Sequence, residues 1–118
     1  MAEALANHYG NDVLQASSSG IAPVTIITRN TVIAMGEMHV DVSRHVPRLY
    51  SPRMAAECDI VVNMSGFKLP GPPPKKLIEW QVNDPMGEPI EVFRTVRGDL
   101  EHRVMRLILD LRRQRAKR

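Results

Sequence analysis

The chain has little of several features that would place it in a common functional class. Its 118 residues include a single cysteine, Cys58, which excludes an internal disulfide and is typical of a reducing compartment. No apolar run approaches the roughly 18 residues that a membrane span needs. The first residues show neither the basic start nor the long apolar stretch of a signal peptide. We therefore expect a cytoplasmic protein without a membrane span.

Metal-binding spacing and a basic folded face are also missing. The four histidines, at positions 8, 39, 45 and 102, lack the paired spacing of metal sites, so we expect no metal and no cofactor. Residues 103–118 carry seven Lys or Arg and one Asp, whereas the rest of the chain has a net charge of −3. A nucleic-acid-binding domain usually spreads its positive charge over a folded face. The tail at residues 112–118 is instead a candidate contact for an anionic partner, through Arg112, Arg113, Arg115, Lys117 and Arg118.

The length is that of one domain, residues 1–118, in which helical and strand patterns alternate. Apolar spacing predicts helices from the first residue, over 31–38 with Asn30 as the cap, from Ser51 and Pro52, and over 90–115. The apolar stripe of the last helix comprises Phe93, Val96, Leu100, Val104, Leu107 and Leu111, with Gly98 interrupting it. Short apolar runs predict strands over 12–18, 59–64 and 76–82, and "VTIIT" (24–28) is a further strand candidate. This alternation predicts an α/β fold with a parallel sheet.

Four segments, in this order, resemble the low-molecular-weight protein tyrosine phosphatases and the related thioredoxin-coupled arsenate reductases. "WQVNDPMGEPIEVFRTVRGDLEHRVMRLI" is similar to the family's Trp-x-Val-x-Asp-Pro loop and its final helix. "AECDIVVNMSG" resembles the family's buried strand, "SSGIAP" its Ser-Ala-Gly-Thr-x-Pro, and "MGEMHVDVS" a helix end followed by Gly-Ile-Asp-x-Ser. In the last of these, His39 replaces the glycine that the family favours, and His tolerates a positive φ better than most residues. The resemblance covers residues 1–111.

The same resemblance explains the start of the sequence. "MAEAL" is similar to the end of the family motif Cys-x-Gly-Asn-x-Cys-Arg-Ser-x-Met-Ala-Glu-Ala, so the nucleophilic Cys, the phosphate-binding Arg and the phosphate loop lie upstream of Met1. We therefore expect a truncated family member that is inactive as it stands, because it lacks both the nucleophile and the cradle for the oxyanion. Two alternatives stay open. One is an active phosphatase whose true start precedes Met1, and the other is a non-enzymatic binding or assembly module that acts through its basic tail.

One site residue follows from the resemblance. Asp84 occupies the position of the family's general acid, which protonates the leaving oxygen. The alternative is that Asp84 only starts a turn before Pro85. The arsenate reductases need a further cysteine pair on the loop after the third strand, and "NMSGFKLPGPPP" has none, which disfavours arsenate reduction. We expect Cys58 to be buried and inert.

The family's first strand lies in the middle of its sheet, so the resemblance implies a three-layer, phosphatase I-like fold without its central strand. Unpaired strand edges are costly when buried and prone to pairing with another chain when exposed. We therefore expect either a homodimer that pairs strands through these edges, or a rearrangement in which "VTIIT" replaces the missing strand.

Overall fold

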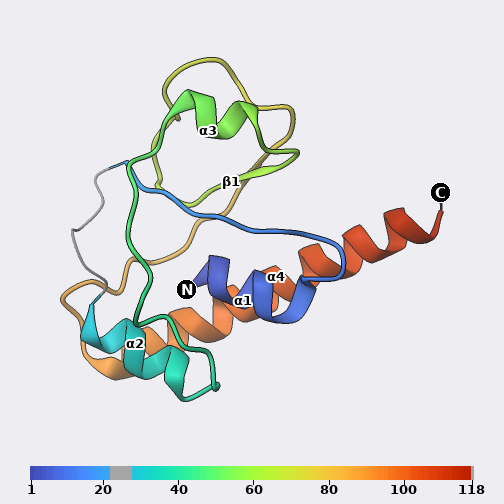
Figure 1. Ribbon diagram of the computed structural model, residues 1–118. Coiled ribbons are helices and arrows are strands. Elements are labelled where there is room, and N and C mark those ends of the chain that lie inside the picture. The colour runs from blue at the N-terminus through green and yellow to red at the C-terminus, as the bar shows by residue number, and fades with distance from the viewer. Residues whose placement is uncertain (22–27, 118) are drawn as a thin grey trace.

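The computed structural model describes residues 1–21 and 28–117, which form an α/β fold with a small parallel sheet (Figure 1). In chain order the elements of these two ranges are α1 (Ala2–Gly10), α2 (Arg29–Gly36), α3 (Pro52–Ala56), β1 (Val61–Asn63), β2 (Leu77–Glu79) and α4 (Ile90–Ala116). The α/β class predicted from the sequence is confirmed.

The long helix α4 organises the core. It packs against α1 and α2, and all three lie on the side of the molecule away from α3 and β1 (Figure 1). The predicted apolar stripe is confirmed at four of its six positions. Leu107 and Leu111 are only half-buried, and the neighbouring Ile108 takes the core position instead. The core cluster comprises Leu5, Ala6, Met35, Val40, Val42, Val96, Leu100, Val104 and Ile108.

A network of arginine contacts joins the end of α2 to α4. Arg94 Nη2 lies 2.7 Å from Glu37 Oε2, and Arg97 Nη1 lies 2.8 Å from Glu37 Oε1. Arg97 Nη1 also donates to the carbonyl of Ala34 at 2.6 Å, which satisfies one of the free carbonyls at the end of α2. The hydrogen bonds from Arg94 and then Arg97 lower the pKa of Glu37 to about 2.

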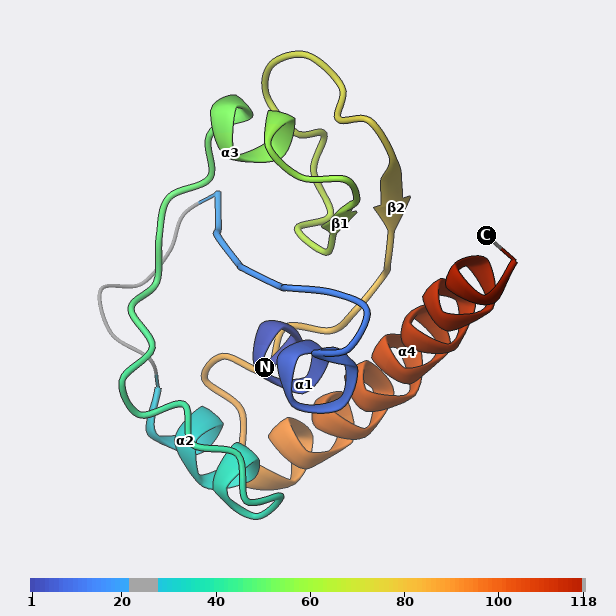
Figure 2. The same ribbon diagram turned by 45° about the vertical axis from the view of Figure 1, so that its right-hand side comes forward.

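The sheet consists of β1 and β2, which pair in parallel with Val61 opposite Leu77 and Asn63 opposite Glu79. The strand predicted over residues 12–18 is wrong as a regular strand. Near it, the described residues show only a single parallel bridge, between Gly20 and Leu49. Residues 12–20 instead run as a segment between the α1–α4 layer and the β1–β2 pair, as both views show (Figures 1 and 2).

Local sequence signals predict one helix start correctly. They place the start of another helix two residues too late. Ser51 caps α3, with its Oγ accepting from the N–H of Met54 at 3.3 Å, and Pro52 is the first helical residue, as predicted. The prediction of Asn30 as a cap is wrong, because α2 begins at Arg29 after an extended Thr28. Of the candidate strand "VTIIT", residues 24–27 lie outside the described residues.

The end of α2 explains the histidine at position 39. His39 has φ 62°, its N–H donates to the carbonyl of Gly36, and the N–H of Val40 donates to the carbonyl of Met35. This pair of bonds is a Schellman motif, in which the residue with positive φ is usually Gly. Val40 and Met35 are both buried in the core and supply the hydrophobic contact that accompanies the motif. The sequence-based expectation of a positive φ at His39 is confirmed.

Candidate functional site

Asp84 lies on the exposed loop between β2 and α4. Its Oδ1 accepts from the N–H of Met86 at 3.0 Å, and the N–H of Glu88 donates to the carbonyl of Pro85 at 2.9 Å. Gly87 completes the turn with φ +79°. The turn-forming interpretation of Asp84 is therefore confirmed. It leaves Oδ2 without a hydrogen-bond partner within residues 1–21 and 28–117.

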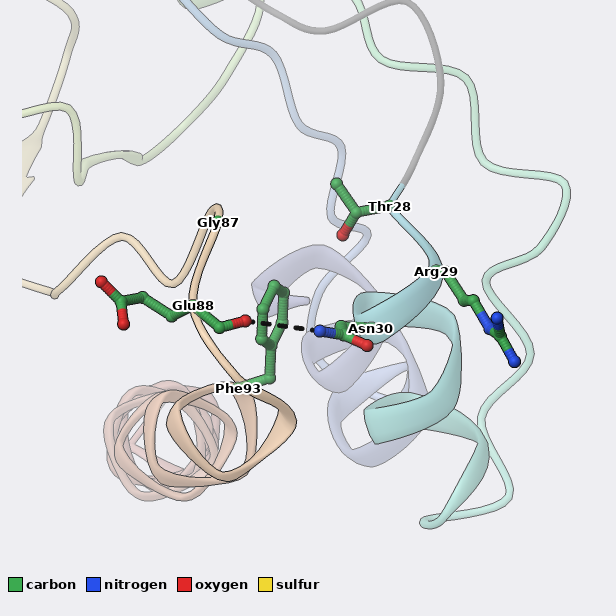
Figure 3. Close-up of a pocket in the computed structure, with 6 residues that line it drawn as sticks. All are labelled: Thr28, Arg29, Asn30, Gly87, Glu88 and Phe93. Atoms are coloured by element: carbon green, nitrogen blue, oxygen red, sulfur yellow. Dashed lines mark hydrogen bonds between the residues drawn. The ribbon is translucent and has the colours of Figure 1, made fainter.

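A hollow of about 290 Å³ lies beside this loop, between the end of the turn and the start of α2 (Figure 3). It is lined by Thr28, Arg29, Asn30, Gly87, Glu88 and Phe93. The amide of Asn30 donates to the carbonyl of Glu88 at 3.4 Å, which ties the loop to α2. The side chains of Arg29 and Glu88 point away from Phe93 in opposite directions (Figure 3). The hollow thus offers a hydroxyl and an amide but no thiol.

A second hollow, of about 450 Å³, lies between α1 and residues 40–45. Two of its lining residues are in direct contact, since His45 Nδ1 lies 3.2 Å from Glu3 Oε2. The Ser43 hydroxyl and backbone N–H both donate to Asp41 Oδ1, and these bonds lower the pKa of Asp41. In the part of the chain that the structure describes, no three His, Cys, Asp or Glu side chains are grouped to hold a metal ion.

Cys58, the only thiol, lies just after α3 and is half-buried. Its Sγ donates to the carbonyl of Met54 at 3.3 Å. No hydrogen bond joins Cys58 to Asp84 within residues 1–21 and 28–117, so the described structure does not pair the thiol with this carboxylate.

Two of the basic residues predicted to contact an anionic partner form hydrogen bonds within the chain instead. Arg112 makes two 3.0 Å hydrogen bonds to the carboxylate of Asp12 and a third to the carbonyl of Tyr9. Arg115 donates to the carbonyl of Asp12 at 2.9 Å. The hydrogen bonds from Arg112 lower the pKa of Asp12. These contacts link α4 to the end of α1. A single-sequence interpretation missed them because Arg112 and Asp12 lie 100 positions apart.

The remaining tail residues divide between local pairing and exposure. Arg113 lies 3.7 Å from Asp110 one turn earlier and is largely exposed, and Lys117 follows the end of α4. Arg118 lies outside the described residues. Among the helices at residues 1–21 and 28–117, none combines the length and the apolar character needed to cross a membrane.

Comparison with known proteins assigns the family. The chain is 34% identical over 113 residues to a glutaredoxin arsenate reductase of Synechocystis sp., covering 92% of this chain and 85% of that protein. It is 31% identical to a putative arsenate reductase of Halobacterium salinarum, covering 81% of this chain and 68% of that protein. The chain belongs to the low-molecular-weight protein tyrosine phosphatase/arsenate reductase family. No family model matches it.

Solved structures agree with this assignment. An arsenate reductase in the reduced state superposes with a TM-score of 0.82 at 29% identity, covering 92% of this chain and 86% of that chain. The arsenate reductase of Archaeoglobus fulgidus superposes with a TM-score of 0.75 at 21% identity, which shows a shared fold alone. The family resemblance drawn from the sequence is thus confirmed. These relatives carry the name arsenate reductase, whereas the sequence interpretation placed phosphatase activity first.

Proposed function

We propose that residues 1–118 form the scaffold of an arsenate-reductase-type domain that presents Asp84 as a proton donor but supplies no thiolate to attack an oxyanion. The observation that carries this proposal is the environment of the chain's only thiol. Cys58 is half-buried and donates to the carbonyl of Met54, and no hydrogen bond joins it to Asp84 within residues 1–21 and 28–117. Thiolate attack on phosphorus or arsenic needs an activated thiol next to the oxyanion. An acid without a nucleophile gives little catalysis.

The test is an activity assay of the purified 118-residue chain. Hydrolysis of p-nitrophenyl phosphate and reduction of arsenate with added glutathione are measured for the unmodified chain, Asp84→Asn and Cys58→Ser. We expect no turnover above the buffer background in any of the three. Turnover that Cys58→Ser abolishes would overturn the proposal, because it would make Cys58 the nucleophile. Turnover that only Asp84→Asn abolishes would uphold the acid and refute the claim of inactivity.

Two alternatives have tests of their own. If the working protein includes residues before Met1 that carry the nucleophile, its intact mass from the native source will exceed that of the 118 residues.

A partner bound through the basic tail would depend on Arg113 and Lys117, because Arg112 and Arg115 already bind Asp12 and Tyr9. Binding of this kind weakens steeply as salt is raised, and it would be lost in the Arg113→Gln, Lys117→Gln variant.

A further inference from the structure

The loop between β1 and β2 contains three consecutive prolines, Pro72, Pro73 and Pro74. Each proline ring fixes φ at about −65° and removes the backbone N–H donor. A residue that precedes a proline is also held in an extended conformation, so Pro72 and Pro73 are restricted to the polyproline II geometry. Because that helix has about three residues per turn, the proline run has the geometry of one turn.

The fold leaves this proline run on the surface. The loop lies at the edge of the molecule beside α3 (Figures 1 and 2). Pro72 and Pro73 are exposed, and Pro74 is half-buried. Within residues 1–21 and 28–117, residues 68–75 form no hydrogen bond with the rest of the chain. The carbonyls of the run are therefore open to a donor from outside, and its rings are available for apolar contact.

Contacts with the fold hold both ends of the proline run. Gly71 has φ +85°, and its backbone lies against Pro52 of α3, since a Cβ at Gly71 would lie 2.5 Å from Cγ of that proline. At the other end, the C=O of Lys76 accepts from the N–H of Val61 at 2.9 Å, directly before β2 begins at Leu77. A segment that is already fixed in shape loses little conformational entropy when it binds. The fold therefore preorganises the run for binding.

The residues that follow the proline run are positively charged. Lys75 and Lys76 are both exposed, and neither side chain forms an ion pair within residues 1–21 and 28–117. Residues 64–76 contain three Lys and no Asp or Glu. A partner that covers the run therefore meets two uncompensated ammonium groups, and carboxylates on its surface complement them.

We propose that residues 72–76 dock into a protein domain of the SH3 or WW kind, whose groove is lined by aromatic side chains and flanked by carboxylates. Grooves of this kind bind polyproline II segments. Tyr O–H and Trp N–H groups in the groove donate to the free carbonyls, while the aromatic rings pack on the prolines. The carboxylates pair with Lys75 and Lys76. Asp84 and Cys58 lie outside this segment, so binding here is independent of the proposed function.

The experiment titrates the unmodified chain against a fixed panel of purified SH3 and WW domains that carry acidic residues beside the groove. Isothermal titration calorimetry should show saturable binding to a panel member. The double variant Pro72→Ala, Pro73→Ala should weaken this binding about tenfold or more, because it removes the rings that fill the groove. Pro70→Ala is the matched control. Pro70 is exposed in the same loop, but Gly71 with its positive φ separates it from the run, so binding should be unchanged.

Charge and position have readouts of their own. The double variant Lys75→Gln, Lys76→Gln should weaken binding about two- to fivefold and reduce its dependence on salt, because exposed ion pairs are weak and screened. Amide NMR of the unmodified chain then locates the contact without any variant. On addition of the bound domain, the amide signals of Lys75 and Lys76 should shift, whereas those of Arg113 and Lys117 on the basic tail should not.

Three results would overturn the proposal. The first is that no panel member binds saturably. The second is that the Pro72→Ala, Pro73→Ala variant binds as the unmodified chain does, or that Pro70→Ala weakens binding equally. The third is that the NMR shifts fall on the basic tail, since an acidic domain would then bind there. Circular dichroism checks each variant, and all should keep the native spectrum because residues 64–76 supply none of the buried core side chains.

Discussion

Replacing Gly10 by Ala should destabilise the fold through one contact between helices. Gly10 ends α1, is buried, and faces α4. A Cβ at this position would lie 2.7 Å from Cγ1 and 2.8 Å from Cδ1 of Ile108, which is fully buried. Overpacking of a core costs about 1–3 kcal/mol. The better helix propensity of Ala offsets part of this loss, by up to about 1 kcal/mol. We expect the free energy of unfolding to fall by about 1–2 kcal/mol.

Urea unfolding followed by circular dichroism at 222 nm measures this change, and Gly98→Ala is its matched control. Gly98 is also helical, but it is exposed, and a Cβ there meets no heavy atom within 4 Å. The control should therefore gain about 0.8–1 kcal/mol from propensity alone. The two glycine-to-alanine changes are chemically identical, so opposite signs isolate the packing effect at Gly10.

A double-mutant cycle with Ile108→Ala identifies the contact responsible. Ile108→Ala alone should cost about 2–5 kcal/mol, since it empties a buried site. In the Gly10→Ala background it should cost about 1–2 kcal/mol less, because the new methyl group then has room. Additive effects, or a neutral Gly10→Ala, would refute the argument that the approach of α1 to α4 requires glycine.

Three further changes test other parts of the structure. His39→Gly should raise the free energy of unfolding by about 0.5–1 kcal/mol in thermal melts, because glycine adopts φ 62° without Cβ strain, and His39→Ala should bring no such gain. Glu37, whose pKa is lowered to about 2, contributes stability above pH 4.5 that is lost as the pH falls toward 2. Glu37→Gln should therefore flatten the pH dependence of the midpoint in that window, with both proteins converging near pH 2. Asn7→Ala should cost about 1–3 kcal/mol in urea titrations, because the N–H and C=O of Ala16 lose their partner, and Asn7→Asp, which keeps the acceptor, should cost less.

Sequence reasoning succeeded where a rule is local. The stripe of α4, the cap at Ser51, the positive φ at His39 and the turn at Asp84 all follow from residues within a few positions of one another. The strand predicted over residues 12–18 failed for the complementary reason. A strand is defined by its partner, and the backbone partners of this segment are the side chains of Asn7 and Arg48 and residues 48–50.

The candidate site divides in the same way. The Asp-Pro signal was enough to place Asp84 in a turn with its Oδ1 engaged. A hydrogen bond from the Asn30 amide to the carbonyl of Glu88 holds that turn against α2. It joins residues 58 positions apart, so no local signal in the sequence predicts it. The hydrogen bonds of Arg112 with Asp12 likewise depend on the packing of α1 against α4, where Gly10 lies close to Ile108, and this packing has no local signal in the sequence.

The hydrophobic core and the two-stranded sheet lie in different parts of this molecule. Within residues 1–21 and 28–117, the buried apolar side chains come from the four helices and from Val40 and Val42, and neither β1 nor β2 contributes one. The only buried residue of β1 is Asn63, whose amide side chain binds the carbonyl of Phe67 and accepts from Ser65. A large-to-small change within β1 or β2 should therefore cost less stability than one at a buried position of α4, because it removes less buried apolar surface.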